Sequence, residues 1–176
     1  MADVLIEEHG HYGFDCSKAV WKSDKIHDIY HACKLSSVLC DVDFVIETEE
    51  NVILVEYKNS NIPEALAHAT PDNEYNPFKG DKLQKIASKF FDSLHYLRVE
   101  GKEKPIHFVF VLEYPKGDSA SRRGLRNRLK GLLPFELQKQ DCFTAGVKLI
   151  EAVAVVNIEE WNEDTMYGQF PIVQIM

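Results

Sequence analysis

Apolar and polar residues alternate with a period of two along residues 41–47, and a continuous apolar run follows at residues 52–55. The segment between them, residues 48–51, is polar and suits a turn. The pattern therefore predicts a β-hairpin. Its second strand is apolar on both faces, which is typical of a central strand covered on both sides.

Two later segments predict further buried strands, because they are apolar and rich in β-branched residues: residues 106–112 and residues 147–156. The chain closes with a possible edge strand at residues 171–175. The long polar stretch at residues 59–80 contains three prolines and predicts the largest irregular insertion.

Helical periodicity appears in three places. Residues 24–34 suit a short helix, for which Ser23 is a plausible N-cap. Residues 79–97 predict an amphipathic helix, with an inward stripe of Leu83, Ile86, Phe90, Leu94 and Leu97 and a basic side of Lys82, Lys85 and Lys89. Residues 119–133 predict a helix with Leu125, Leu129 and Leu132 facing inward.

Strands and helices alternate after the hairpin, so the sequence predicts an α/β fold with a mixed central β-sheet flanked by helices. With 176 residues and 45% hydrophobic content, we expect one domain spanning residues 1–176. The N-terminus has no lysine or arginine, and no apolar run reaches about 18 residues. We therefore expect no signal peptide and no membrane association, and a cytoplasmic protein.

The cysteines do not form a metal-binding or disulfide pattern. Cys16, Cys33, Cys40 and Cys142 contain no CxxC pair and no zinc-ribbon or iron-sulfur spacing. In a reducing compartment we expect them to be core thiols.

The net charge of -8 argues against a protein that coats nucleic acid through bulk electrostatics. Positive charge is concentrated at residues 116–130, which hold six basic residues and one acid. Two basic helix faces could contact phosphates, or could simply be solvated surface. They comprise Arg122, Arg126 and Lys130 on the later helix and Lys82, Lys85 and Lys89 on the earlier one.

Candidate chemistry lies at the open end of the predicted hairpin. A turn centred on Glu49 and Glu50 would place Asp43 opposite Glu56, and Asp41 opposite Lys58. These four charges would share one face of the hairpin, and the opposite face would carry Val42, Phe44, Val55 and Tyr57. Two opposed carboxylates repel one another unless a positive charge lies between them. Mg²⁺, which prefers oxygen ligands, suits such a pair better than zinc does.

The hairpin resembles the core signature of the PD-(D/E)xK nuclease superfamily, which has a restriction-endonuclease-like core. The matching residues are Asp43-Phe44-Val45-Ile46 on one strand and Ile53-Leu54-Val55-Glu56-Tyr57-Lys58 on the next. The resemblance implies that Asp43, Glu56 and the Tyr57 carbonyl bind Mg²⁺ or Mn²⁺. It also implies that Asp43, Glu56 and Lys58 are the catalytic residues.

Two positions depart from the family pattern. Val42 stands where the family often has a proline, and the upstream acid has three candidates: Glu7, Glu8 and Asp28. Asp41 could replace Asp43 as the metal ligand if the strand begins earlier. A second Glu-x-Lys triplet at Glu100 lacks a preceding apolar strand.

The resulting hypothesis is a metal-dependent nuclease that hydrolyses phosphodiester bonds of nucleic acid, with DNA as the expected substrate. A homodimer would suit cleavage of both strands of a duplex. Two alternatives stay open. The chain could keep the nuclease fold for non-catalytic binding of nucleic acid or protein, or it could be an unrelated α/β interaction domain with incidental hairpin charges.

Overall fold

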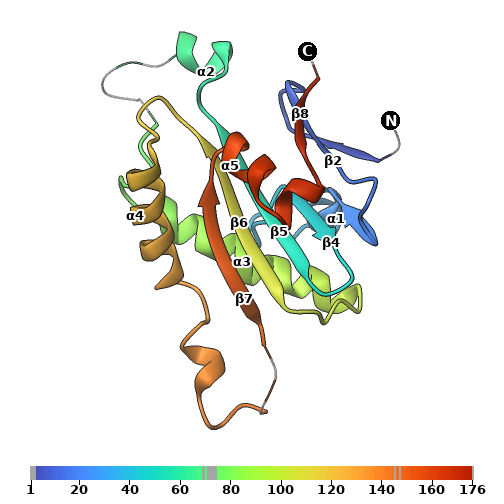
Figure 1. Ribbon diagram of the computed structural model, residues 1–176. Coiled ribbons are helices and arrows are strands. Elements are labelled where there is room, and N and C mark those ends of the chain that lie inside the picture. Colours follow the sequence, from blue (N-terminus) through green and yellow to red (C-terminus); the bar gives the residue numbers. More distant parts are fainter. Residues whose placement is uncertain (1–2, 69, 71–74, 145, 147, 176) are drawn as a thin grey trace.

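The computed structural model describes residues 3–68, 70, 75–144, 146 and 148–175. Its centre is a five-stranded sheet in the order β3-β4-β5-β6-β7 (Figure 1). The strands are β3 (Trp21–Ser23), β4 (Phe44–Glu47), β5 (Val52–Asn59), β6 (Ile106–Glu113) and β7 (Ile150–Val156). Pairing is antiparallel from β3 to β5 and parallel from β5 to β7. The predicted α/β fold with a mixed sheet is therefore confirmed.

A second, antiparallel sheet joins the two ends of the chain (Figure 1). It consists of β1 (Val4–Ile6), β2 (Tyr12–Asp15) and β8 (Ile172–Gln174). The predicted C-terminal strand is thus confirmed, although it pairs with β2 and not with the central sheet. The sequence did not predict β1, β2 or β3, which are only three or four residues long and show no clear alternation.

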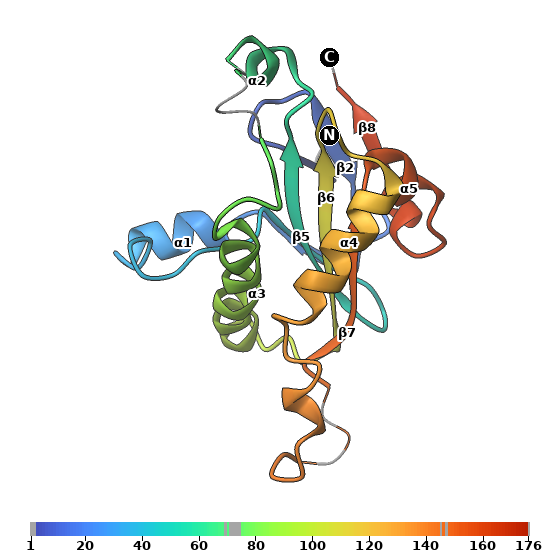
Figure 2. The same cartoon turned by 90° about the vertical axis from the view of Figure 1, so that its left-hand side faces the viewer.

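Helices cover one face of the central sheet, and the second sheet and a short helix cover the other (Figure 2). The first layer contains α3 (Lys82–Val99) and α4 (Ser119–Lys130), and the second contains α5 (Ile158–Glu163). Val52 and Leu54 of β5 face the first layer, whereas Ile53 and Val55 face the second. Burial on both faces explains why β5 is a continuous apolar run. Within the described residues, no helix has the length and apolar character needed to cross a bilayer.

The β4-β5 hairpin has the predicted register, in which Phe44 pairs with Val55 and Glu47 with Val52. The Thr48 hydroxyl accepts hydrogen bonds from the amides of Glu50 and Asn51 and so stabilises the turn. The first strand was predicted to begin at residue 41, which is wrong, since β4 begins at Phe44. As a result, Val42 packs in the α3 layer and not beside Phe44 and Val55 as predicted.

The remaining helical segments are short. They are α1 (Ile26–Ala32), α2 (Pro63–Ala67) and the 3-10 turns η1 (Leu137–Lys139) and η2 (Tyr167–Gln169). Ser23 is not the N-cap of α1, because it belongs to β3 and its hydroxyl contacts Tyr96. The helix predicted at residues 119–133 ends at Lys130, which leaves Leu132 39% exposed.

The cysteines are not uniformly core residues. Cys16 is buried and Cys40 is partly buried, but Cys33 and Cys142 are exposed. The prediction of four core thiols is therefore wrong for Cys33, which follows the end of α1, and for Cys142, which follows η1.

Candidate active site

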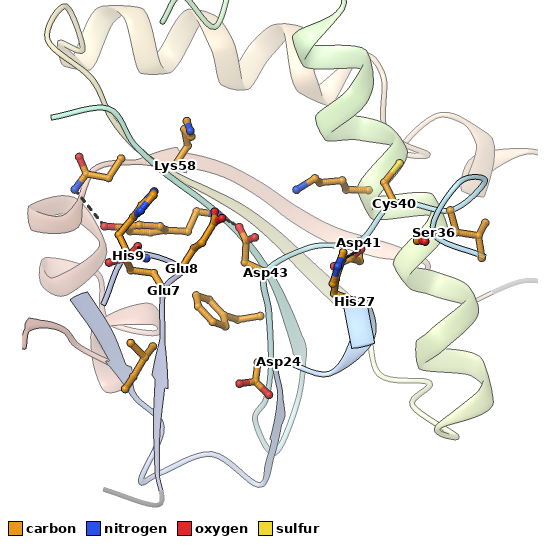
Figure 3. Close-up of a pocket in the computed structure, with 16 residues that line it drawn as sticks. Glu7, Glu8, His9, Asp24, His27, Ser36, Cys40, Asp41, Asp43 and Lys58 are labelled. Carbon is orange, nitrogen blue, oxygen red and sulfur yellow. Dashed lines mark hydrogen bonds and ion pairs between the residues drawn. The ribbon is translucent and has the colours of Figure 1, made fainter. Parts of the chain in front are cut away.

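A cleft of about 630 Å³ opens beside the carboxyl end of β5. In open α/β sheets this edge is where ligands commonly bind. Its lining comes from the β1-β2 turn, α1, the segment before β4, the end of β5 and α3 (Figure 3). The charged residues that line it are Glu7, Glu8, Asp24, Asp41, Asp43, Lys58 and Lys89. The cleft therefore brings acidic side chains from distant parts of the chain to the predicted site.

Asp43 lies immediately before β4 and is fixed against the neighbouring strand. Its Oδ2 accepts a hydrogen bond of 2.7 Å from the Tyr57 amide. Burial is the main reason why the pKa of Asp43 is raised, and the negative charges of Asp41 and Glu8 add to the effect. Lys89 and the Tyr57 amide act in the opposite direction. Asp43 is thus held in one orientation among other acids.

Glu56 lies on β5 behind the cleft wall and is 8% exposed. Burial, followed by repulsion from Asp43, raises its pKa to about 8. The register that pairs Phe44 with Val55 sets Asp43 and Glu56 on neighbouring strands, and the negative charge of Asp43 opposes ionisation of Glu56. Lys89 offsets part of this repulsion, because its Nζ lies 2.8 Å from both carboxylate oxygens of Glu56.

Lys58 lies on the same strand but does not contact either acid in the hydrogen bonds found among the described residues. Its side chain is exposed at the cleft and points away from Asp43 (Figure 3). The Nζ atom lies 5.9 Å from the centre of the Tyr75 ring. The structure therefore brings Asp43 and Glu56 together and leaves the Lys58 ammonium at the rim.

The Tyr57 carbonyl, the third predicted metal ligand, projects toward the same side of β5 as Asp43. Within a β-strand, the amide and carbonyl of one residue face the same neighbour. Since the Tyr57 amide donates to Asp43, its carbonyl also faces the start of β4. This geometry places a backbone oxygen on the Asp43 side of the strand.

The structure separates the three candidates for the upstream acid. Glu7 accepts hydrogen bonds from the amides of His9, His11 and Tyr12, so it stabilises the β1-β2 turn. Asp28 is on α1, outside the cleft lining, and pairs with Lys25. Glu8 is exposed at the cleft and points toward Asp43 (Figure 3). Of the three candidates, Glu8 is therefore the one whose side chain is directed at the predicted metal site.

Asp41, the alternative metal acid, lies at the far side of the cleft from Glu8 (Figure 3). Its Oδ1 is 3.4 Å from Nδ1 of His27. Because β4 begins at Phe44 and not earlier, Asp43 is the acid that reaches β5.

The proposed basic face of α3 needs correction at Lys89. This lysine is directed at Glu56, whereas Lys85 is exposed and pairs with Asp81. Lys82 lies 4.4 Å from the centre of the Tyr75 ring. Lys89 continues the buried positions Ile86 and Ser93 at helical spacing, a signal that could have identified it as facing inward.

On α4, Arg122 faces the protein interior and does not share an outward face with Arg126 and Lys130, as the suggested phosphate contacts would require. It is 7% exposed, and its guanidinium forms bonds of 2.6 and 2.7 Å with the Glu160 carboxylate. Arg126 and Lys130 are exposed and remain available to a polyanion. The i, i+4, i+8 spacing predicted one shared basic face, but Arg122 lies next to Leu125 and Leu129 on the buried side of the helix.

Comparison with protein-family models, curated proteins and solved structures finds no match. Among the described residues, no group of three or more His, Cys, Asp or Glu side chains is arranged to hold a metal ion. A site built from two carboxylates, a backbone carbonyl and water would need fewer acidic side chains than such a group. The oxygen donors at Asp43, Glu56 and Tyr57 have the number and chemistry of that simpler arrangement, although Lys89 contacts both Glu56 oxygens.

Proposed function

We propose that this chain is a metal-dependent nuclease that hydrolyses phosphodiester bonds, with DNA as the expected substrate. The observation that carries the proposal is that the hairpin register sets Asp43 and Glu56 on neighbouring strands at the end of β5, where Asp43 lines a cleft and is bound by the Tyr57 amide. A divalent cation would relieve their repulsion, and an all-oxygen donor set favours Mg²⁺ or Mn²⁺.

The order of elements supports a restriction-endonuclease-like core. Helix α1 precedes the β4-β5 hairpin, α3 follows it, and β6 then pairs parallel with β5. The resemblance to the PD-(D/E)xK superfamily implies a helix and a further strand after the lysine-bearing strand. The Glu56-Tyr57-Lys58 triplet stands at the end of β5, where the resemblance implies it.

The chain's own residues would divide the work at this site. Asp43, held by the Tyr57 amide, and Glu56 would hold the ion together with the Tyr57 carbonyl. When bound, a divalent ion polarises the scissile phosphate and promotes ionisation of the attacking water. The exposed Lys58 side chain can rotate from the rim toward the phosphate and stabilise the negative charge that develops there.

Partly or fully exposed basic residues on the α3-α4 side of the sheet would contribute phosphate contacts. These are Lys82 and Lys85 on α3 and Arg126 and Lys130 on α4. Contacts of this kind increase affinity without reading sequence. Cleavage of both strands of a duplex would require two copies, because one site cuts one strand.

The test is cleavage of labelled single- and double-stranded DNA and RNA in the presence of Mg²⁺ or Mn²⁺. We expect chelator-sensitive cleavage that falls roughly 100-fold or more in Asp43→Asn, Glu56→Gln and Lys58→Met. Lys139→Met, an exposed lysine on η1 that pairs with Glu136, is the matched control and should cleave normally.

Nucleic-acid binding without cleavage in any metal would contradict the nuclease proposal and favour the non-catalytic alternative. Cleavage that persists in Asp43→Asn would show that the activity belongs to another site or to a contaminant.

A further inference from the structure

Lys89 occupies the position at which the proposed metal site needs a cation. Its ammonium lies 2.8 Å from both oxygens of the Glu56 carboxylate, so neither oxygen can bind a metal ion without competing with it. The lysine side chain is 27% exposed and lines the cleft, whereas the Glu56 side chain is 11% exposed. The contact is therefore a built feature of the site and not a surface ion pair.

The surroundings of Lys89 show which charges it balances. Asp41, Asp43 and Glu56 all act electrostatically on this ammonium. Among the described residues, Lys89 is the lysine that forms an ion pair with Glu56. Lys58 lies at the rim of the cleft near Tyr75. One ammonium group thus lies among three acids. The acids outnumber it, so a divalent ion could balance the remaining negative charge.

We propose that Lys89 is an active-site lysine that holds Glu56 in place when no metal ion is bound, is displaced when the ion binds, and then contacts the substrate phosphate. This inference rests on the proposed nuclease function. A lysine side chain has four rotatable carbon-carbon bonds and an ammonium that can turn toward a new anion without moving α3. Because Lys89 already lines the cleft, a phosphate bound there is within the region that the released ammonium can reach.

The experiment compares Mg²⁺ affinity, measured by calorimetry, with cleavage in Lys89→Met, Lys89→Arg and the wild type. Removing the competing charge should make Lys89→Met bind Mg²⁺ about tenfold more tightly, because a like charge near the ion no longer opposes it. The same variant should cleave nucleic acid roughly tenfold or more slowly. Lys89→Arg, which keeps the charge, should bind Mg²⁺ as the wild type does.

A lysine with a purely structural role would not produce these opposite changes. Lys139→Met, the exposed lysine on η1 that pairs with Glu136, is the control for Mg²⁺ affinity and should leave it unchanged. Thermal unfolding of each variant establishes that it is folded.

Unchanged or weaker Mg²⁺ binding in folded Lys89→Met would overturn the inference about Lys89. If Asp43→Asn still abolished Mg²⁺ binding in that case, the proposed function would stand. If the wild type bound no Mg²⁺, with or without nucleic acid, the proposed function would fail and the role of Lys89 with it.

Discussion

The folded protein disfavours a negative charge on Glu56. Burial and the neighbouring Asp43 raise its pKa to about 8, although Lys89 is bound to it. A group whose pKa is raised on folding keeps a proton that the unfolded chain has already released. Its contribution to stability therefore decreases as the pH rises from about 4.5 to about 8. Such a cost at one position is common where stability is exchanged for function.

Glu56→Gln should remove this pH dependence, since glutamine does not ionise. We expect its free energy of unfolding, relative to the wild type, to increase by roughly 2 to 4 kcal/mol between pH 5 and pH 8.5. Urea unfolding at a series of pH values measures the difference. Glu50→Gln, in the exposed turn of the same hairpin, should change by no more than about 0.5 kcal/mol. A Glu56→Gln difference that does not vary with pH would contradict the account of this carboxylate.

The residues of the site differ in how far the sequence could predict them. Asp43 and Glu56 were predictable because their positions follow from hairpin register alone. The direction of Lys89 depends on how α3 packs against β5, and the approach of Glu8 depends on the β1-β2 turn. Contacts of this second kind are tertiary, so local periodicity carries little information about them.

At the level of secondary structure, long buried elements were predicted and short ones were missed. β5 and β6 contain eight residues each and are apolar along most of their length. β1 and β3 contain three residues each, too few to show a clear alternation, and each is stabilised by pairing with a neighbouring strand. The predicted start of β4 was wrong because residues 41–43 alternate in polarity without forming a strand.

Helix α4 illustrates how identical residue types on one helix serve different purposes. Arg122 is buried against Glu160 and also donates to the Gly117 carbonyl, so it attaches the start of α4 to α5. Arg126, one turn later, is exposed and contacts the side chain of Asn127. The first arginine is part of the fold, and the second is available to a ligand.

Arg122→Met should lower the free energy of unfolding by about 2 to 3 kcal/mol, because it leaves a partly buried carboxylate without its partner. Arg126→Ala should change stability by less than about 0.5 kcal/mol but weaken nucleic-acid binding and its dependence on salt. Urea unfolding and fluorescence anisotropy at two salt concentrations separate the two effects. Equal losses of affinity in both folded variants would show that Arg122 contacts nucleic acid after all.

Across the whole molecule, the fold gathers the acids at the cleft from separate regions. The β1-β2 turn supplies Glu8 and the segment before β4 supplies Asp43 to the cleft lining, and β5 carries Glu56 behind the cleft wall. The second sheet, which contains both chain ends, supports the turn that carries Glu8 (Figure 1). The overall charge of -8 is compatible with nucleic-acid binding only if metal ions and the basic residues of α3 and α4 offset it locally.

The most direct test of the central claim is the position of Mn²⁺ in crystals of the wild-type protein, located by anomalous scattering. We expect a peak about 2.1 Å from carboxylate oxygens of Asp43 and Glu56 and from the Tyr57 carbonyl, with Lys89 moved away from Glu56. A peak elsewhere, or no peak with Lys89 still bound to Glu56, would contradict the metal site on which the proposed nuclease depends.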